Sequence, residues 1–129
     1  MTPRTRDWLR KAEADRRIAR RGVRLRPPEY DDACFHCQQA VEKYLKALLC
    51  ERGFTVPHTH DLVALTDHVL PSDPSVGRLQ KRVGRLTAYA VRFRYPGAHS
   101  DRRRAIAATK TVERVRNEIR RLLGLRERP

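Results

Sequence analysis

Two arginines and a histidine near residues 92–99 are the strongest candidates for chemistry in this sequence. Four residues separate Arg94 from His99, and six separate Arg92 from His99. Arginine stays charged and can hold a phosphate with two donors, whereas histidine titrates near neutral pH and can transfer protons. Together they could promote attack of an RNA 2′-hydroxyl on a phosphodiester without a metal ion. The same residues can also form a purely structural turn, because a Pro-Gly dipeptide follows Tyr95.

A second group of polar residues lies on one side of the segment 29–53. In a helix, Gln38, Gln39, Glu42 and Lys43 share one face. Paired glutamines are suited to hydrogen bonds with a base edge or a backbone. The alternative is that these four side chains form ordinary solvated surface.

Three further residues are second-tier candidates for binding. We expect His60 and Asp61 to begin a helix, where free backbone N–H groups can bind an anion. They can equally be a helix cap and a histidine satisfied by a nearby carboxylate. Asp15 falls within an expected apolar stripe, so it is either paired with an arginine or a semi-buried carboxylate facing the site.

The cysteine-histidine content raises the alternative of a zinc site. Cys34 and Cys37 share a helix face, and His36, His58 or His60 could complete a tetrahedral set of ligands. Both cysteines, however, lie on an apolar stripe, where free cysteine behaves as a small hydrophobic residue. We therefore predict no metal and no other cofactor.

Basic residues dominate the composition. The chain has 29 Lys and Arg against 15 Asp and Glu, which gives a formal net charge of +14. Such an excess favours a phosphate-rich partner, although it can also be a solvated surface. The same two alternatives apply to the arginines expected on the last helix, which are Arg102, Arg103, Arg104, Arg114, Arg116, Arg120 and Arg121.

Several classes of protein are not indicated. No run of 18 apolar residues predicts a membrane span, and the N-terminus lacks the apolar core of a signal peptide. Three cysteines within one expected helix fit a reducing compartment, so we expect a cytoplasmic protein. The sequence also lacks a Gly-rich phosphate loop and the Gly-Ser and paired-aspartate signature of nucleotidyltransferases.

Apolar residues recur every three or four positions in almost every segment, which predicts helices and a single all-α domain over residues 1–129, with its core at about 5–123. Segment 29–53 should be the buried central helix, ended by Gly53. The whole should be a five-helix up-and-down bundle. The other expected helices are 5–23 capped by Thr5, 59–70 capped by Thr59, 75–93, and 101–123 capped by Asp101 and ended by Gly124.

Six short segments follow one another in a specific order along the chain: Ala14-Asp15 with Ala19, Tyr30, Gln38–Lys43, Lys46–Leu49, Thr59–Leu62 and Arg94-Tyr95-Pro96. In this order they resemble the HEPN family, a nucleotide-binding domain of higher eukaryotes and prokaryotes. The resemblance covers about residues 8–123.

This resemblance implies an activity and its partners. Many HEPN ribonucleases carry an arginine, four to six residues, and a histidine, which matches Arg94 or Arg92 with His99. Toxin-like members have a tyrosine where this chain has Asp101, so the match to them is incomplete. The form Arg94-Tyr95-Pro96 is more similar to the stand-alone prokaryotic members. The resemblance implies a homodimer that binds nucleotide or RNA. It also implies a minimal nucleotidyltransferase partner, encoded with this chain as a two-gene toxin–antitoxin-like module, which could modify Tyr95.

Two functions therefore stay open. The chain can be a metal-independent endoribonuclease that uses Arg94, His99 and Arg92. It can instead be a non-catalytic interaction module that binds a nucleotidyltransferase and its nucleotide. In both cases the resemblance implies that Gln38, Gln39, Glu42, Lys43, His60, Asp61, Tyr95 and Asp15 contribute to the binding groove or the dimer contact.

Overall fold

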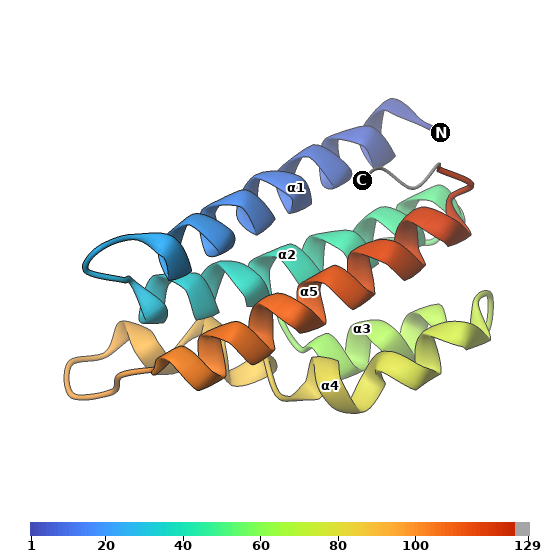
Figure 1. The fold of residues 1–129 in the computed structure, drawn as a ribbon. Coiled ribbons are helices and arrows are strands. Elements are labelled where there is room, and N and C mark those ends of the chain that lie inside the picture. The colour runs from blue at the N-terminus through green and yellow to red at the C-terminus, as the bar shows by residue number, and fades with distance from the viewer. Residues whose placement is uncertain (126–129) are drawn as a thin grey trace.

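The structure, a computed structural model, describes residues 1–125 and is all-helical within them, which confirms the predicted all-α class. Figure 1 shows three long helices side by side, with two shorter helices beneath one part of them. No helix of the described part is both long and apolar enough to cross a bilayer. The α-helices are α1 (Pro3–Arg24), α2 (Tyr30–Glu51), α3 (Leu62–Val69), α4 (Gln80–Gly84) and α5 (Arg102–Leu122), and the 3-10 segments are Pro74–Leu79, Thr87–Ala90 and Arg92–Arg94.

Helix α2 is the centre of the bundle, as its apolar period predicts. It packs against α1, α3 and α5, and its apolar face is almost fully buried. Leu45, Leu48 and Leu49 belong to the main core together with Leu65 of α3 and Ile119 of α5. Burial of one leucine side chain contributes roughly 2 kcal/mol to folding, so this face holds the other helices in place.

The start of α1 differs from the prediction. Thr2, not Thr5, caps the helix, because its hydroxyl accepts a hydrogen bond from the Thr5 N–H at 3.1 Å. Pro3 then occupies the first turn, where its fixed φ and missing N–H are compatible with a helix. The Thr5 hydroxyl is buried and donates to Glu51 of α2 at 3.0 Å, so it joins two helices instead.

The start of α3 is also shifted. Asp61 is the cap, and its Oδ1 accepts hydrogen bonds from the N–H groups of Val63 and Ala64 at 3.0 and 3.2 Å. The Thr59 hydroxyl accepts a hydrogen bond from Asp61 N–H and only shapes the preceding turn. The predicted cap at Thr59 was therefore wrong, and His60 lies outside the helix.

The predicted helix 75–93 is not continuous. It consists of the short α4 and the three 3-10 segments. Glycine lowers helix propensity by about 1 kcal/mol, and two glycines interrupt this stretch. A Cβ at Gly84 would lie 3.1 Å from Val63 Cγ2, and one at Gly77 would lie 3.1 Å from Leu70 Cδ2. The glycines thus permit close packing against α3 at the expense of a regular helix.

The predicted ends of α2 and α5 are confirmed. Gly53 and Gly124 have φ values of +81° and +73°, a conformation that glycine adopts without strain. Asp101 caps α5 by accepting a hydrogen bond from Arg104 N–H at 2.8 Å. These local signals place the turn 92–99 immediately before α5.

Candidate functional site

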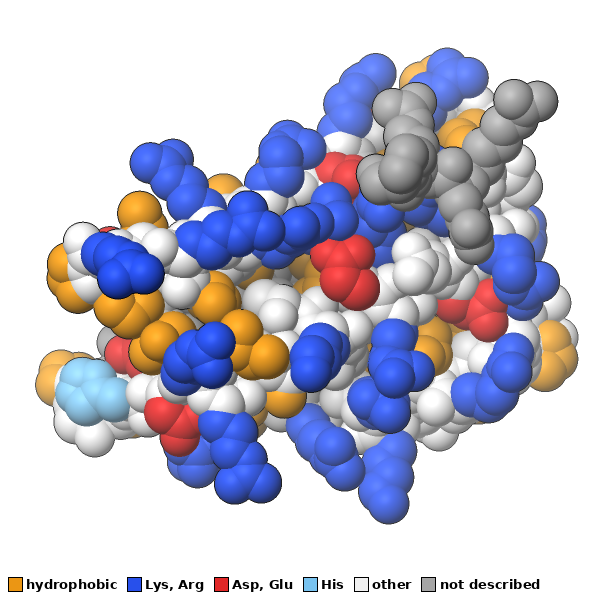
Figure 2. Space-filling view, viewed as in Figure 1, with side chains coloured by type: hydrophobic (Ala, Val, Ile, Leu, Met, Phe, Trp, Pro, Cys, Tyr) orange, Lys and Arg blue, Asp and Glu red, His pale blue; other side chains and the backbone are white. Residues whose placement is uncertain are grey.

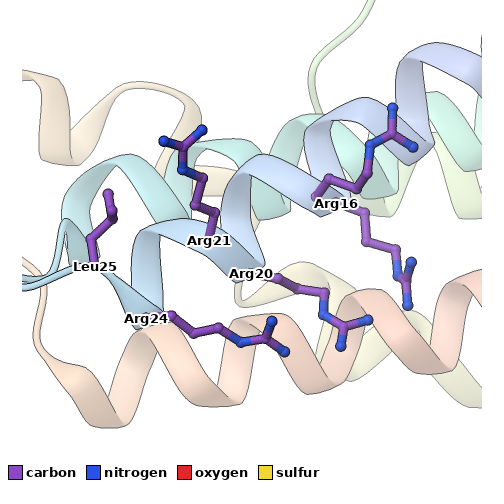
Figure 3. A pocket seen from close by; sticks show the side chains of 6 residues that line it. Arg16, Arg20, Arg21, Arg24 and Leu25 are labelled. Carbon is purple, nitrogen blue, oxygen red and sulfur yellow. The ribbon is translucent and has the colours of Figure 1, made fainter.

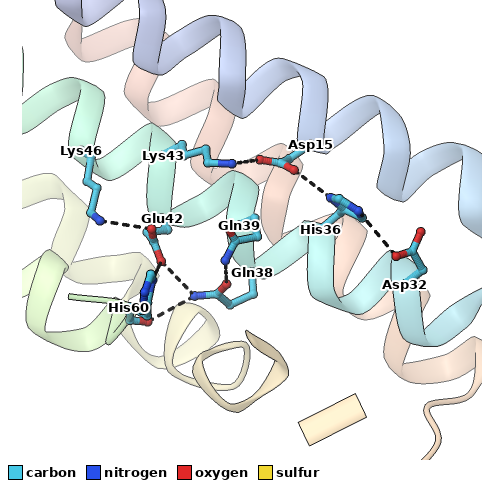
Figure 4. A network of polar contacts seen from close by, with 9 residues as sticks. All are labelled: Asp15, Asp32, His36, Gln38, Gln39, Glu42, Lys43, Lys46 and His60. Atoms are coloured by element: carbon cyan, nitrogen blue, oxygen red, sulfur yellow. Dashed lines mark hydrogen bonds and ion pairs between the residues drawn. The ribbon is translucent and has the colours of Figure 1, made fainter. Parts of the chain in front are cut away.

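A strip of polar side chains runs along the face of α2 that α1 flanks (Figure 4). Asp15 of α1 is its centre: one carboxylate oxygen lies 2.7 Å from His36 Nδ1, and the other accepts a hydrogen bond from Lys43. His36 Nε2 lies 3.5 Å from Asp32. Asp15 is thus a buried carboxylate that pairs with a histidine and a lysine, so the alternative that it pairs with an arginine was wrong.

A buried polar cluster continues the strip toward α3. Glu42 accepts a hydrogen bond from Lys46 at 3.1 Å and lies 2.7 Å from His60 Nδ1. The Glu42 and Lys46 side chains are only 5% and 7% exposed. Gln38 donates to Glu42 and to the His60 carbonyl oxygen, and it accepts a hydrogen bond from Gln39. Gln38 and Glu42 are therefore interior residues, and the alternative of a fully solvated face was wrong for them.

Buried charges in such a cluster need compensation. Removing a carboxylate and an ammonium from water is costly unless hydrogen bonds satisfy both groups. Glu42 accepts from Lys46 and Gln38, and the exposed ring of His60 covers it from the loop before α3. The cluster therefore fixes the path of the loop that leads to α3.

The N-terminus of α3 is already occupied by a side chain. The Asp61 carboxylate accepts from the N–H groups that an external anion would need. His60 is likewise engaged with Glu42. The two residues thus have the geometry of a cap and a satisfied histidine.

The turn 92–99 contacts the first turns of α2. His99 Nδ1 lies 3.2 Å from an oxygen of Asp31, and the His99 side chain is 75% exposed. The Arg94 guanidinium lies 4.9 Å from the ring centroid of Phe35. Asp31 and Phe35 are four residues apart and share one helix face, so α2 brings Arg94 and His99 to the same side of the molecule.

The two remaining candidate residues of the turn, Arg92 and Tyr95, have different surroundings. The Arg92 guanidinium lies 5.2 Å from the ring centroid of Phe93, whose side chain is buried. Tyr95 is 64% exposed. Neither residue forms an ion pair within the described part of the chain, so both can meet an external group.

The turn and the polar strip form one continuous surface. The rings of Phe35 and His36 meet edge to face with centroids 5.1 Å apart. Arg94 lies on Phe35, and His36 lies on Asp15. Sequence reasoning considered His36 only as a zinc ligand and missed its place here. The spacing of Asp32, His36 and Lys43 by four and seven residues was the signal that could have found it.

The residues considered as alternative zinc ligands do not point toward one common position. Cys34 Sγ lies 3.1 Å from Ser100 Oγ, Cys37 is buried in the core, and His36 contacts Asp15. Residues 1–125 contain no group of three or more His, Cys, Asp or Glu side chains placed to hold a metal ion. Burial raises the pKa of the Cys37 thiol; it also raises that of Cys34, although the Ser100 hydrogen bond opposes this. Both thiols are therefore protonated at neutral pH.

The arginines of α5 do not form one uniform row. Arg116 is largely buried and donates to Glu13 of α1 at 2.7 Å. Arg104 pairs with Asp101, the cap of α5, and Arg121 pairs with Glu118. Arg103 and Arg114 form no ion pair with the described residues and are exposed. The arginines of α5 thus include both structural and solvated side chains.

Comparison with known proteins agrees with this fold. The HEPN domain model matches residues 5–122. TT1696 from Thermus thermophilus is 31% identical, with a TM-score of 0.81 over 93% of this chain and 98% of that one. ST0689, described as an archaeal HEPN homologue, is 25% identical, with a TM-score of 0.75 over 92% and 97%. No curated protein matches the sequence. The chain therefore belongs to the HEPN domain family.

Proposed function

We propose that this protein binds nucleotide or RNA on the surface formed by the polar strip of α2 and the turn 92–99. The observation that carries the proposal is the placement of Arg94 and His99 on Phe35 and Asp31 of one α2 face. An exposed imidazole and an arginine on one surface can meet the same phosphodiester. Gln39 and Lys43 lie farther along this face and supply further hydrogen-bond donors.

The proposed activity is metal-independent RNA cleavage, with His99 as acid and base. A hydrogen bond from His99 Nδ1–H to Asp31 leaves Nε2 free to accept a proton. Nε2 takes the proton of the 2′-hydroxyl while the 2′-oxygen bonds to phosphorus. The 5′-oxygen leaves and takes a proton from a protonated histidine, which gives a cyclic phosphate and a 5′-hydroxyl. Arg94, with Arg92 as a second clamp, stabilises the charge on the phosphate oxygens.

We also propose that the protein is a homodimer in which the turns 92–99 of two copies form one composite site. Val91 and Tyr95 flank the two arginines and are 57% and 64% exposed. Large exposed apolar side chains next to a functional turn favour an interface. Two copies that meet here would bring two His99 side chains to one groove, so that one accepts a proton and the other donates one.

The second candidate is a non-catalytic module that binds a minimal nucleotidyltransferase and its nucleotide. It is favoured by Asp101, which caps α5 where toxin-like relatives carry a tyrosine hydroxyl. In either case we propose that the chain is one half of a cytoplasmic two-gene toxin–antitoxin-like module. Tyr95, being exposed, is the residue that the partner enzyme could modify.

The test is RNA cleavage in EDTA by the wild type, His99→Ala and Arg94→Ala. Matched controls are His68→Ala and Arg6→Ala, because both side chains are exposed and form no ion pair in the described chain. Cleavage that only the first two variants lose supports the ribonuclease. An inert wild type that binds nucleotide, with weaker binding in Lys43→Ala, supports the binding module. Cleavage that survives both site substitutions places the activity elsewhere.

A further inference from the structure

A second feature lies on the face that α1, α5 and α4 share: a series of connected hollows. The first lies along α1 and shares Arg20 and Arg24 with the next, which lies between α1 and α5. That hollow shares Lys110 with a third, between α5 and α4. The third shares Arg82 with a fourth, again between α4 and α5. The hollows thus form one path across three helices.

Exposed cations that form no ion pair with the described residues line this path. The acids along it, Glu113, Glu118 and Asp101, already pair with neighbouring arginines. Figure 2 shows Lys and Arg side chains spread over this face and few acidic ones between them. We call the exposed cations that line the hollows and form no ion pair within residues 1–125 the basic track: Arg17, Arg21, Arg24, Arg82, Arg85, Arg103, Lys110 and Arg114.

The spacing of these cations suits a repeating anion. Arg17, Arg21 and Arg24 are four and three residues apart, which is about 6 and 4.5 Å along the axis of α1. Figure 3 shows Arg20 and Arg24 directed from α1 toward α5, where Lys110 lies. Cations held this close repel one another, and a polyanion would relieve the repulsion while releasing its own counterions.

A nucleic-acid backbone fits this surface better than a membrane does. A helix that binds a bilayer surface also inserts large apolar side chains. Within the described chain, the large exposed apolar residues are Met1, Ile18, Phe54, Val91 and Tyr95, and none of them lines these hollows. The track is thus charged without an apolar anchor.

The basic track is separate from the polar strip of α2. Asp15 and Arg20 lie on opposite flanks of the buried face of α1: Asp15 contacts α2, and Arg20 pairs with Glu113 of α5 at 3.6 Å. In Figure 1 α5 lies in front of α2, whereas in Figure 4 the network lies in front of α2 with α5 behind it. The two surfaces therefore face different directions.

We infer that the basic track holds the phosphodiester backbone of an RNA strand, away from the surface that carries the turn 92–99. This rests on the proposed function only in taking RNA as the polyanion. Backbone contacts of this kind fix the position of a strand without reading its sequence. An RNA could thus be held on one face while a different part of it reaches the proposed site.

The test is the salt dependence of binding to a fluorescent single-stranded RNA of about 20 nucleotides, measured by anisotropy. The variant Arg21→Gln/Arg24→Gln/Lys110→Gln removes three track cations. Its affinity should fall on the order of a hundredfold at about 0.1 M salt, and the slope of log K against log salt should decrease by about 2. The matched control is Arg6→Gln/Lys11→Gln/Lys81→Gln, three exposed cations that form no ion pair in the described chain and line none of these hollows.

Three results would overturn the inference. The wild type could fail to bind the RNA. The two triple variants could lose affinity equally, which would make net charge alone responsible. The wild type could bind vesicles that contain phosphatidylserine, and the track variant could lose this vesicle binding while its RNA binding stays unchanged. The face would then be a membrane surface. Circular dichroism checks that each variant is folded. RNA cleavage by His99→Ala tests the proposed site at the turn 92–99, so that test is independent of the three binding results.

Discussion

Asp15 of α1 and His36 of α2 face each other at 2.7 Å, and the second oxygen of the same carboxylate accepts a hydrogen bond from Lys43. One acid from the first helix thus orients two polar residues on the surface of the central helix. The Phe35 ring links this pair to Arg94. Asp15 is therefore a positioning residue for the proposed surface, although it belongs to α1 and lies far from the turn 92–99 in the sequence.

We expect Asp15→Asn to destabilise the protein by about 1–3 kcal/mol, because it removes the buried carboxylate that serves both Lys43 and His36. Chemical unfolding at neutral pH measures this change. The control Asp7→Asn removes an exposed pair with Arg10 and should cost less than about 1 kcal/mol. Equal effects of the two substitutions would contradict the central place of Asp15.

The pair of Glu42 and Lys46 should be strongly coupled. Because both side chains are buried, Glu42→Gln and Lys46→Met should each cost about 3–5 kcal/mol by leaving one charge without its partner. The double variant should cost clearly less than the sum of the two. A double-mutant cycle from unfolding free energies checks this, and strict additivity would show that the two residues act independently.

Glu13 should make the protein sensitive to acid. Burial opposes ionisation of Glu13, but hydrogen bonds from Arg116 and Tyr44 and the nearby arginine charges outweigh it, so its pKa lies below the ordinary value of 4.5. A lowered pKa contributes stability above pH 4.5 that is lost as pH falls through the folded-state value. The free energy of unfolding should therefore fall below about pH 4.5 less steeply in Glu13→Gln than in the wild type. Parallel curves would exclude this contribution.

The three cysteines should differ in reactivity. Cys34 and Cys37 are buried, and burial raises the pKa of both thiols, whereas Cys50 is partly exposed. The thiolate is the reactive form, so a thiol reagent should modify Cys50 first. Titration should count one reactive thiol in the native protein and three after denaturation. Cys50→Ser should abolish the native reaction, and a remaining fast thiol would show that the core opens readily.

Local signals in the sequence predicted much of the fold. The apolar period of α2, the cap at Asp101 and the stops at Gly53 and Gly124 all depend on residues within a few positions of each other. These signals act within a single helix and its ends, and the structure confirms them. The motif order also indicated the HEPN family, which the comparisons show.

Long-range contacts decided the features that the sequence left open and those that were predicted wrongly. Thr5 faces Glu51, 46 residues away, so it does not cap α1, and Gly84 lies against Val63 within a broken helix. The site residues needed the same information, because His99 and Asp31 are 68 positions apart. The sequence by itself determined where the three long helices lie, which of their faces are apolar and which residues can carry a charge. Only the tertiary structure decided which charges meet, because packing sets the free energy of a contact between distant residues and no local pattern records it.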